Sequence, residues 1–125
     1  MATIVVVEDQ PDNLKLFKAL LTMKGHRVIG LTSGDGLVAT LLAEQPAPEL
    51  VLLDIQLPGR DGFSVLRDLK KLEGEHPWKV VALTAHAMPG DREKTLAAGF
   101  DGYIAKPIDV RGFGEEVARF LSASR

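Results

Sequence analysis

Short runs rich in aliphatic residues alternate along the chain with longer stretches of helical periodicity. The aliphatic runs contain little polar alternation, which is typical of strands buried on both faces of a parallel sheet. The clearest is the Leu-Val-Leu-Leu run at residues 50–53, which ends abruptly on the carboxylate of Asp54. The pattern predicts five strands, at residues 3–7, 27–31, 50–53, 79–83 and 102–105.

After each run, apolar residues recur three or four positions apart, the spacing of one face of a helix. Proline, glycine, aspartate and serine mark the ends of these stretches as turns and helix caps. The third stretch has two candidate caps, Asp61 and Ser64, and the fourth has Leu96 as its only large aliphatic residue beyond Met88 at its entry. The pattern predicts five helices, at residues 11–24, 37–42, 63–72, 91–98 and 110–121.

Five strands that alternate with five helices at short connections predict an α/β fold, a parallel sheet with right-handed crossovers and helices on both faces. The 125 residues lie in the single-domain range, and their 46% hydrophobic content is sufficient for a core. Because the fourth helix has so small an apolar face, we expect it to be weakly anchored and therefore a candidate for movement.

Charge and cysteine content exclude several classes of function. The net charge is −2 and no basic stripe is present, which argues against nucleic acid or an anionic membrane as a partner. With no cysteine, the chain offers no disulfide, thiolate metal site or cysteine nucleophile. It also has no signal peptide and no apolar run of about 18 residues that could span a membrane. We therefore expect a cytoplasmic protein.

Reactive side chains follow four of the five predicted strands. They are Glu8 and Asp9 after the first strand, Asp54 after the third, Thr84 after the fourth and Lys106 after the fifth. The carboxyl ends of parallel strands meet at one edge of the sheet, and ligands of such folds bind there. We therefore expect these side chains to lie together.

This combination of side chains predicts metal-assisted phosphoryl transfer. Three carboxylates in one crevice repel one another, which raises their pKa values unless a cation neutralises them. Only oxygen ligands are at hand, so a hard cation fits, and Mg²⁺ fits best. Asp54 is the candidate nucleophile, while Lys106 and the metal would neutralise the phosphoryl oxygens.

Together these motifs resemble those of the receiver domains of two-component response regulators, over residues 3–121. The resemblance rests on Glu8-Asp9, on Asp54 followed by Pro58 and Gly62, and on the pairs Thr84-Ala85 and Lys106-Pro107. It implies a three-layer, doubly wound, flavodoxin-like fold of the CheY type, with strand order 2-1-3-4-5 and five helices. It also implies one bacterial receiver domain over residues 1–125 without an output domain, as in stand-alone regulators of the cell-cycle and phosphorelay type.

The resemblance implies a role for each residue at the sheet edge. Asp54 would accept a phosphoryl group from a phosphohistidine of a histidine kinase or phosphotransferase, as a regulator and not a turnover enzyme. Asp9, Asp54 and the backbone carbonyl of Gln56 would hold Mg²⁺, with Glu8 acting through a bound water. Lys106 would pair with the phosphoryl oxygens.

The resemblance also implies a switch. Thr84 would swing its hydroxyl onto the phosphoryl group and Tyr103 would move inward. The face formed by the fourth helix, fifth strand and fifth helix would then shift and control downstream proteins, such as a kinase. A cis peptide before Pro107 would aim the lysine into the site, and the side chains of Gln56 and His86 would govern the lifetime of the acyl phosphate.

Each of these side chains also has an ordinary structural explanation. The acidic and hydroxyl groups could cap turns or helix ends. Lys106 could be a solvated lysine, Tyr103 a core aromatic residue, and His86 a surface loop residue with no kinetic role.

Three other functions compete with the stand-alone receiver. A receiver module of a hybrid histidine kinase carries the same motifs, although Met1 favours a complete protein. A Mg²⁺-dependent aspartyl phosphohydrolase would have an Asp-x-Asp motif, whereas this chain has Gln56 in place of the second aspartate. A flavin-binding protein of the same topology would cradle a phosphate in its first loop, but residues 8–11 are acidic and free of glycine.

Overall fold

The central element of the fold is a parallel sheet of five strands. The computed structural model describes residues 2–44, 47–57, 60–72, 78–85, 90–106 and 108–122. The strands are β1 (Thr3–Val7), β2 (Arg27–Leu31), β3 (Leu50–Asp54), β6 (Lys79–Thr84) and β7 (Gly102–Ala105). Their order is β2-β1-β3-β6-β7, and every neighbouring pair is parallel. This is the predicted order, 2-1-3-4-5, when the five strands of the sheet are counted along the chain.

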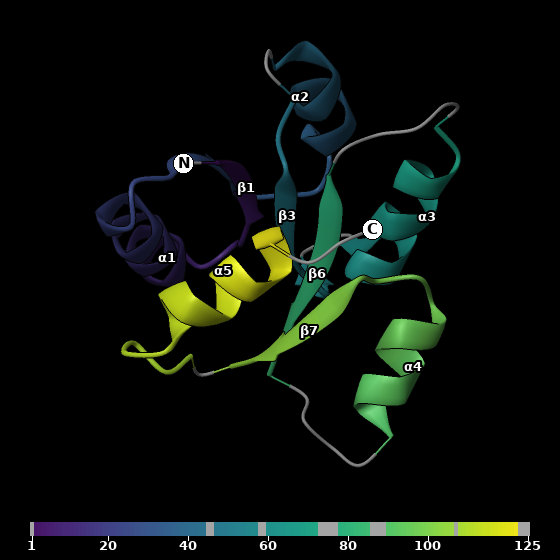
Figure 1. Ribbon diagram of the computed structural model, residues 1–125. Coiled ribbons are helices and arrows are strands. Elements are labelled where there is room, and N and C mark those ends of the chain that lie inside the picture. The colour runs from purple at the N-terminus through teal and green to yellow at the C-terminus, as the bar shows by residue number, and fades with distance from the viewer. Residues whose placement is uncertain are drawn as a thin grey trace.

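Helices cover both faces of this sheet (Figure 1). They are α1 (Pro11–Met23), α2 (Leu37–Ala43), α3 (Gly62–Lys70), α4 (Asp91–Ala97) and α5 (Phe113–Ser122). On one face α1 and α5 lie together, where the rings of Phe17 and Phe113 stack with centroids 5.4 Å apart. On the other face, α2 and α3 pack against the sheet and α4 lies next to α3.

Strand β3 divides the hydrophobic core into two clusters, one on each face of the sheet. All five of its residues are buried. Successive side chains of a strand point to opposite faces, so Val51 and Leu53 join the cluster under α2 and α3, while Leu50 and Leu52 join the cluster under α1 and α5. This double burial is what the uninterrupted aliphatic run predicts, and it fixes Asp54 at the end of the central strand.

Helix ends agree with the sequence prediction in most places. Asp61 is the cap of α3, because its Oδ1 accepts a hydrogen bond from the Ser64 N–H at 2.8 Å. The predicted start of the last helix at Val110 is wrong, because Val110 lies outside that helix. A turn at Asp109 precedes the helix, in which Asp109 O accepts the N–H of Phe113, so α5 begins only at Phe113 and leaves Val110 53% exposed.

The structure adds a small hairpin that the sequence pattern did not predict. Strands β4 (Gln56–Leu57) and β5 (Arg60–Asp61) pair antiparallel directly after Asp54. Gly62 closes the hairpin, because its N–H donates to Ile55 O at 2.9 Å and a Cβ at this position would lie 2.6 Å from Ile55 Cα. The chain after Asp54 therefore turns back tightly against the site.

Helix α4 is weakly anchored, as its sequence predicts. Thr95 is its only buried residue, and its one large aliphatic side chain, Leu96, is 39% exposed. None of the helices in the described ranges combines the length and hydrophobicity that a membrane crossing needs.

Candidate functional site

Four strand ends bring the predicted residues to one edge of the sheet. The register pairs Val7 with Leu53, so Glu8 and Asp9 emerge beside Asp54. It also pairs Asp54 with Leu83, which places the end of β3 beside that of β6. The clustering that the parallel topology predicts is therefore confirmed.

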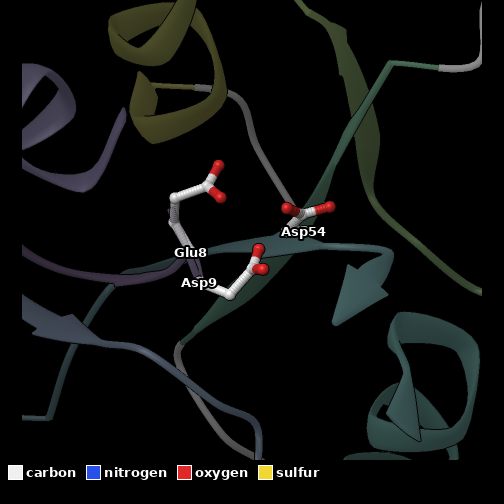
Figure 2. Close-up of side chains that lie close together, drawn as sticks. All are labelled: Glu8, Asp9 and Asp54. Atoms are coloured by element: carbon white, nitrogen blue, oxygen red, sulfur yellow. The ribbon is translucent and has the colours of Figure 1, made fainter. Parts of the chain in front are cut away.

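Three carboxylates form an acidic cluster at this edge (Figure 2). Each of Glu8, Asp9 and Asp54 offers an oxygen, and these oxygens all lie within 4.8 Å of one another. Glu8 is fully buried, Asp54 is 3% exposed and Asp9 is half-buried. The Asp9 carboxylate points toward Asp54, whereas that of Glu8 points in a different direction. A set of carboxylate oxygens at this spacing is suited to a hard divalent cation.

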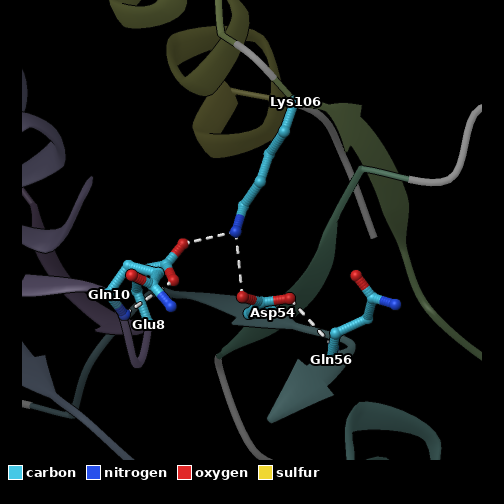
Figure 3. A network of polar contacts seen from close by, with 5 residues as sticks. All are labelled: Glu8, Gln10, Asp54, Gln56 and Lys106. Carbon is cyan, nitrogen blue, oxygen red and sulfur yellow. Dashed lines mark hydrogen bonds and ion pairs between the residues drawn. The ribbon is translucent and has the colours of Figure 1, made fainter.

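Lys106 lies between two of these carboxylates (Figure 3). Its Nζ is 2.5 Å from Glu8 Oε1 and 2.9 Å from Asp54 Oδ2. Its backbone N–H donates to Thr84 O at 2.7 Å, which fixes the start of the side chain to the end of β6. The contact with Glu8 is an ion pair without hydrogen-bond geometry, so among the described residues Glu8 Oε1 is buried with no hydrogen-bond partner.

Burial and charge shift the pKa values of this pair. Burial raises the pKa of Glu8 above its usual value and the negative charge of Asp54 adds to this, while the contacts with Lys106 and with the Gln10 N–H only partly offset it. Burial alone would lower the pKa of Lys106, but its contacts with Glu8 and Asp54 outweigh burial and raise it. Lys106 is therefore a firmly protonated ammonium, and it supplies the positive charge of the site.

Both oxygens of Asp54 are held in place. Oδ1 accepts the Gln56 backbone N–H at 2.9 Å, and Oδ2 accepts from Lys106 Nζ. The first contact is the turn-capping contact that the ordinary explanation of Asp54 predicts, and it is compatible with a chemical role for the same carboxylate. The Gln56 side chain itself is exposed.

The candidate switch residues lie on the two strands at this side of the sheet. Thr84 is buried at the end of β6, and Tyr103 is half-buried on β7, where it pairs with Ala82. Their proposed movements stay predictions. Pro58, His86 and Pro107 lie outside the described residues. The loop proline after Asp54, the role of His86 in the lifetime of the acyl phosphate and the cis peptide before Pro107 therefore stay predictions.

A pocket beside the site was missed in the sequence. It has a volume of about 480 Å³ and lies between α1 and the segment after β7, lined by Asn13, Leu16, Phe17, Ala85, Lys106 and Ile108. Its walls come from distant segments, so no local pattern announces it. The one available signal was Leu16, a large aliphatic residue outside the helical stripe of α1, which is 37% exposed.

Comparison with known proteins relates this geometry to a family. The model of the response regulator receiver domain matches residues 4–118. The Polar-differentiation response regulator DivK of Brucella ovis is 40% identical over 119 residues, which cover 95% of this chain and 95% of that protein.

Two solved structures share the fold and part of the sequence. The receiver domain of a sensor histidine kinase from Pseudomonas aeruginosa PAO1, with a magnesium ion coordinated in its active-site cleft, is 32% identical with a TM-score of 0.83, and the match covers 98% of each chain. A response regulator receiver protein from Burkholderia phymatum is 33% identical with a TM-score of 0.82, and the match covers 99% of this chain and 98% of that chain.

Proposed function

Because the chain belongs to the response regulator receiver domain family of two-component signalling, we propose that Asp54 is its phosphoacceptor. A member of this family is a phosphorylation-dependent signalling switch that interacts with histidine kinases or phosphotransfer proteins. The observation that carries the proposal is the environment of Asp54. Its carboxylate is 3% exposed at the end of β3, with Lys106 Nζ 2.9 Å from Oδ2.

The transfer step follows from these contacts. A carboxylate oxygen of Asp54 attacks the phosphorus of a phosphohistidine in the partner protein. The new P–O bond forms as the P–N bond breaks, and the imidazole nitrogen keeps the electron pair and takes up a proton. Lys106 neutralises charge on the phosphoryl oxygens. Hydrolysis later reverses the modification, because water attacks the phosphorus and the Asp54 carboxylate leaves with the electrons of its P–O bond.

The donor set fits Mg²⁺ at this position. Asp9, Asp54 and the backbone carbonyl of Gln56 are the ligands that we propose, with Glu8 acting through a bound water. All of these donors are oxygen atoms, as this ion requires. When bound, the metal supplies positive charge at the phosphoryl oxygens. The magnesium in the receiver domain from Pseudomonas aeruginosa supports this assignment.

We propose that the output surface consists of α4, β7 and α5. Thr84, at the end of β6, would turn its hydroxyl toward the phosphoryl group, and Tyr103 would move inward on β7. The small buried contribution of α4, Thr95 alone, supports a helix that can change position. Downstream proteins in the cytoplasm would read this surface, whether the domain acts alone or as a module of a hybrid histidine kinase.

Phosphoramidate, a small donor with a P–N bond, tests the proposal directly. With Mg²⁺ present, the mass of the intact protein should increase by one phosphoryl group, and an Asp54→Asn variant should gain none. An Asp35→Asn variant, altered at an exposed loop position, should label like the wild type. Labelling that persists in Asp54→Asn would overturn the assignment, and continuous release of phosphate from a phosphomonoester would favour the hydrolase alternative.

A further inference from the structure

Gly34, in the turn between β2 and α2, is a buried glycine that has no room for a side chain. A Cβ at this position would lie 2.6 Å from Cγ2 of Val65 in α3, and 3.6 Å from Cδ1 of Leu57 in β4. The first distance is well inside the van der Waals separation of two carbon atoms, about 3.5 to 4.0 Å. Gly34 does not have a positive φ. The space around this residue, and not its backbone conformation, therefore requires a glycine.

The surroundings of Gly34 cannot easily give way. Val65 is 1% exposed and belongs to the core cluster under α2 and α3. As a β-branched residue it has few alternative rotamers, and a close-packed interior passes a displacement on to its neighbours. The turn is held from the other side, because Gly34 O accepts the N–H of Leu37, a fully buried residue, at 3.3 Å. A side chain at position 34 would therefore push Val65 and the start of α3.

The first turn of α3 lies directly against the backbone that carries the phosphoacceptor. Gly62 precedes Val65 by three residues, so the two lie on the same side of the helix. The Gly62 N–H donates to Ile55 O at 2.9 Å, and a Cβ on Gly62 would lie 2.9 Å from Asp54 O. Displacement of Val65 is therefore passed on to the peptide groups that follow Asp54.

Leu57 connects Gly34 to the proposed metal ligand. Its side chain is 8% exposed and packs in the same core cluster as Val65. The carbonyl of Gln56 and the nitrogen of Leu57 belong to one planar peptide group, so the position of Leu57 determines the orientation of that carbonyl. The Gln56 N–H donates to Asp54 Oδ1 at 2.9 Å. Gln56 is thus held by Asp54 on one side and by Leu57 on the other.

We propose that Gly34 is a positioning residue for the Mg²⁺ site, because it leaves the space that Val65 and Leu57 need. This inference rests on the proposed function, in which Asp54 and the Gln56 carbonyl bind the metal. The end of β2 carries none of the reactive side chains at the sheet edge. In this proposal it contributes to the site through the absence of a side chain.

A Mg²⁺ titration of ¹⁵N-labelled protein, followed by NMR without a phosphodonor, tests the proposal. Gly34→Ala should weaken Mg²⁺ binding by roughly tenfold or more, as the loss of a group that orients metal ligands does. Gly36→Ala is the matched control, because a Cβ on Gly36 would meet no non-adjacent described residue within 4 Å. This control should bind Mg²⁺ like the wild type. Wild-type affinity in Gly34→Ala would overturn the proposal.

A double-mutant cycle tests the route through α3. Val65→Ala removes both Cγ methyl groups and with them the clash at position 34. In the Val65→Ala background, Gly34→Ala should therefore change the Mg²⁺ affinity by no more than about twofold. An equal loss of affinity in both backgrounds would show that Gly34 does not act through Val65, and would overturn the proposal.

Spectra of the metal-free protein locate the change. The amide resonances of Gln56 and Gly62 should shift in Gly34→Ala and stay in place in Gly36→Ala. Unchanged resonances of both residues in Gly34→Ala would contradict the proposed displacement.

Leu57→Ala is the second variant, for the case that these spectra show Gly34→Ala to be unfolded. It removes the side chain that orients the Gln56 carbonyl without adding an atom, and should also weaken Mg²⁺ binding by roughly tenfold or more. Wild-type affinity in Leu57→Ala would overturn the proposal. Failure of the phosphoacceptor assignment has a different signature, because phosphoramidate would then still label Asp54→Asn.

Discussion

The sheet edge around Asp54 and helix α4 are anchored in opposite ways. At the edge, Glu8 and Asp54 are buried and Lys106 is held by ion pairs to both of them. In α4 only Thr95 is buried, and Leu96 is 39% exposed. Phosphoryl transfer requires groups that are preorganised, whereas signalling requires an element that a small free energy can move. The molecule meets the two requirements in different places.

Helix α3 shows that the difference is specific to α4. Both helices lie on the same face of the five-stranded sheet, but α3 buries Val65, Leu66 and Leu69 in the core. One contact between the two helices places Lys94 Nζ 6.0 Å from the ring centre of Phe63. Helix α3 therefore serves as the fixed reference against which movement of α4 can be measured.

The largest expected effect is on stability. Leu66→Ala removes a side chain that is 1% exposed and should lower the free energy of unfolding by about 3 kcal/mol. Leu96→Ala, the matched change in α4, should lower it by less than about 1 kcal/mol. Urea denaturation of both variants measures this. Equal losses would show that α4 is anchored as firmly as α3.

Lys106→Met should slow phosphorylation by phosphoramidate by roughly a hundredfold, because it removes the charge that neutralises the phosphoryl oxygens. Lys94→Met, an exposed lysine of α4, should leave the rate unchanged. Rates are measured from the increase in protein mass with time. If both variants react at the same rate, Lys106 is not part of the chemistry.

Features that depend on local sequence patterns could be predicted, whereas features that depend on contacts between distant residues could not. The strands could be predicted because residues 50–53 and their counterparts are buried on both faces, and the acidic edge followed from parallel topology. The hairpin β4–β5 was missed because two-residue strands have no periodicity. Val110 was placed in α5 because its spacing fits the stripe, while the turn at Asp109 decided otherwise.

The different burial of Glu8 and Asp9 was also beyond the sequence pattern. An acidic pair does not reveal which carboxylate is buried. The burial of Glu8 depends on its contact with Lys106, a residue far away in the sequence. The pocket lined by Leu16 and Ile108 was missed for the same reason, because its lining residues are distant in the sequence and meet only in the folded protein.

A smaller effect is expected in the pH dependence of stability. The pKa of Glu8 is raised above its usual value of 4.5 by burial and by Asp54. In the pH range just above 4.5, the folded protein therefore holds a proton that the unfolded chain has released, and stability falls as pH rises through this window.

Glu8→Gln should remove this part of the pH dependence. In metal-free buffer, the stability of the wild type relative to the variant should fall as the pH rises above 4.5, as urea denaturation can measure. A difference that stays constant, or grows with pH, would contradict the raised pKa.

Amide hydrogen exchange with and without beryllofluoride and Mg²⁺ most directly tests the claim that a group on Asp54 is read out through α4. Beryllofluoride stands in for the phosphoryl group on the carboxylate. Exchange should change in α4 and β7 and stay the same in α3, and an Asp54→Asn variant should show no change. Unchanged exchange in α4 of the wild type, with the ligand bound, would contradict the account.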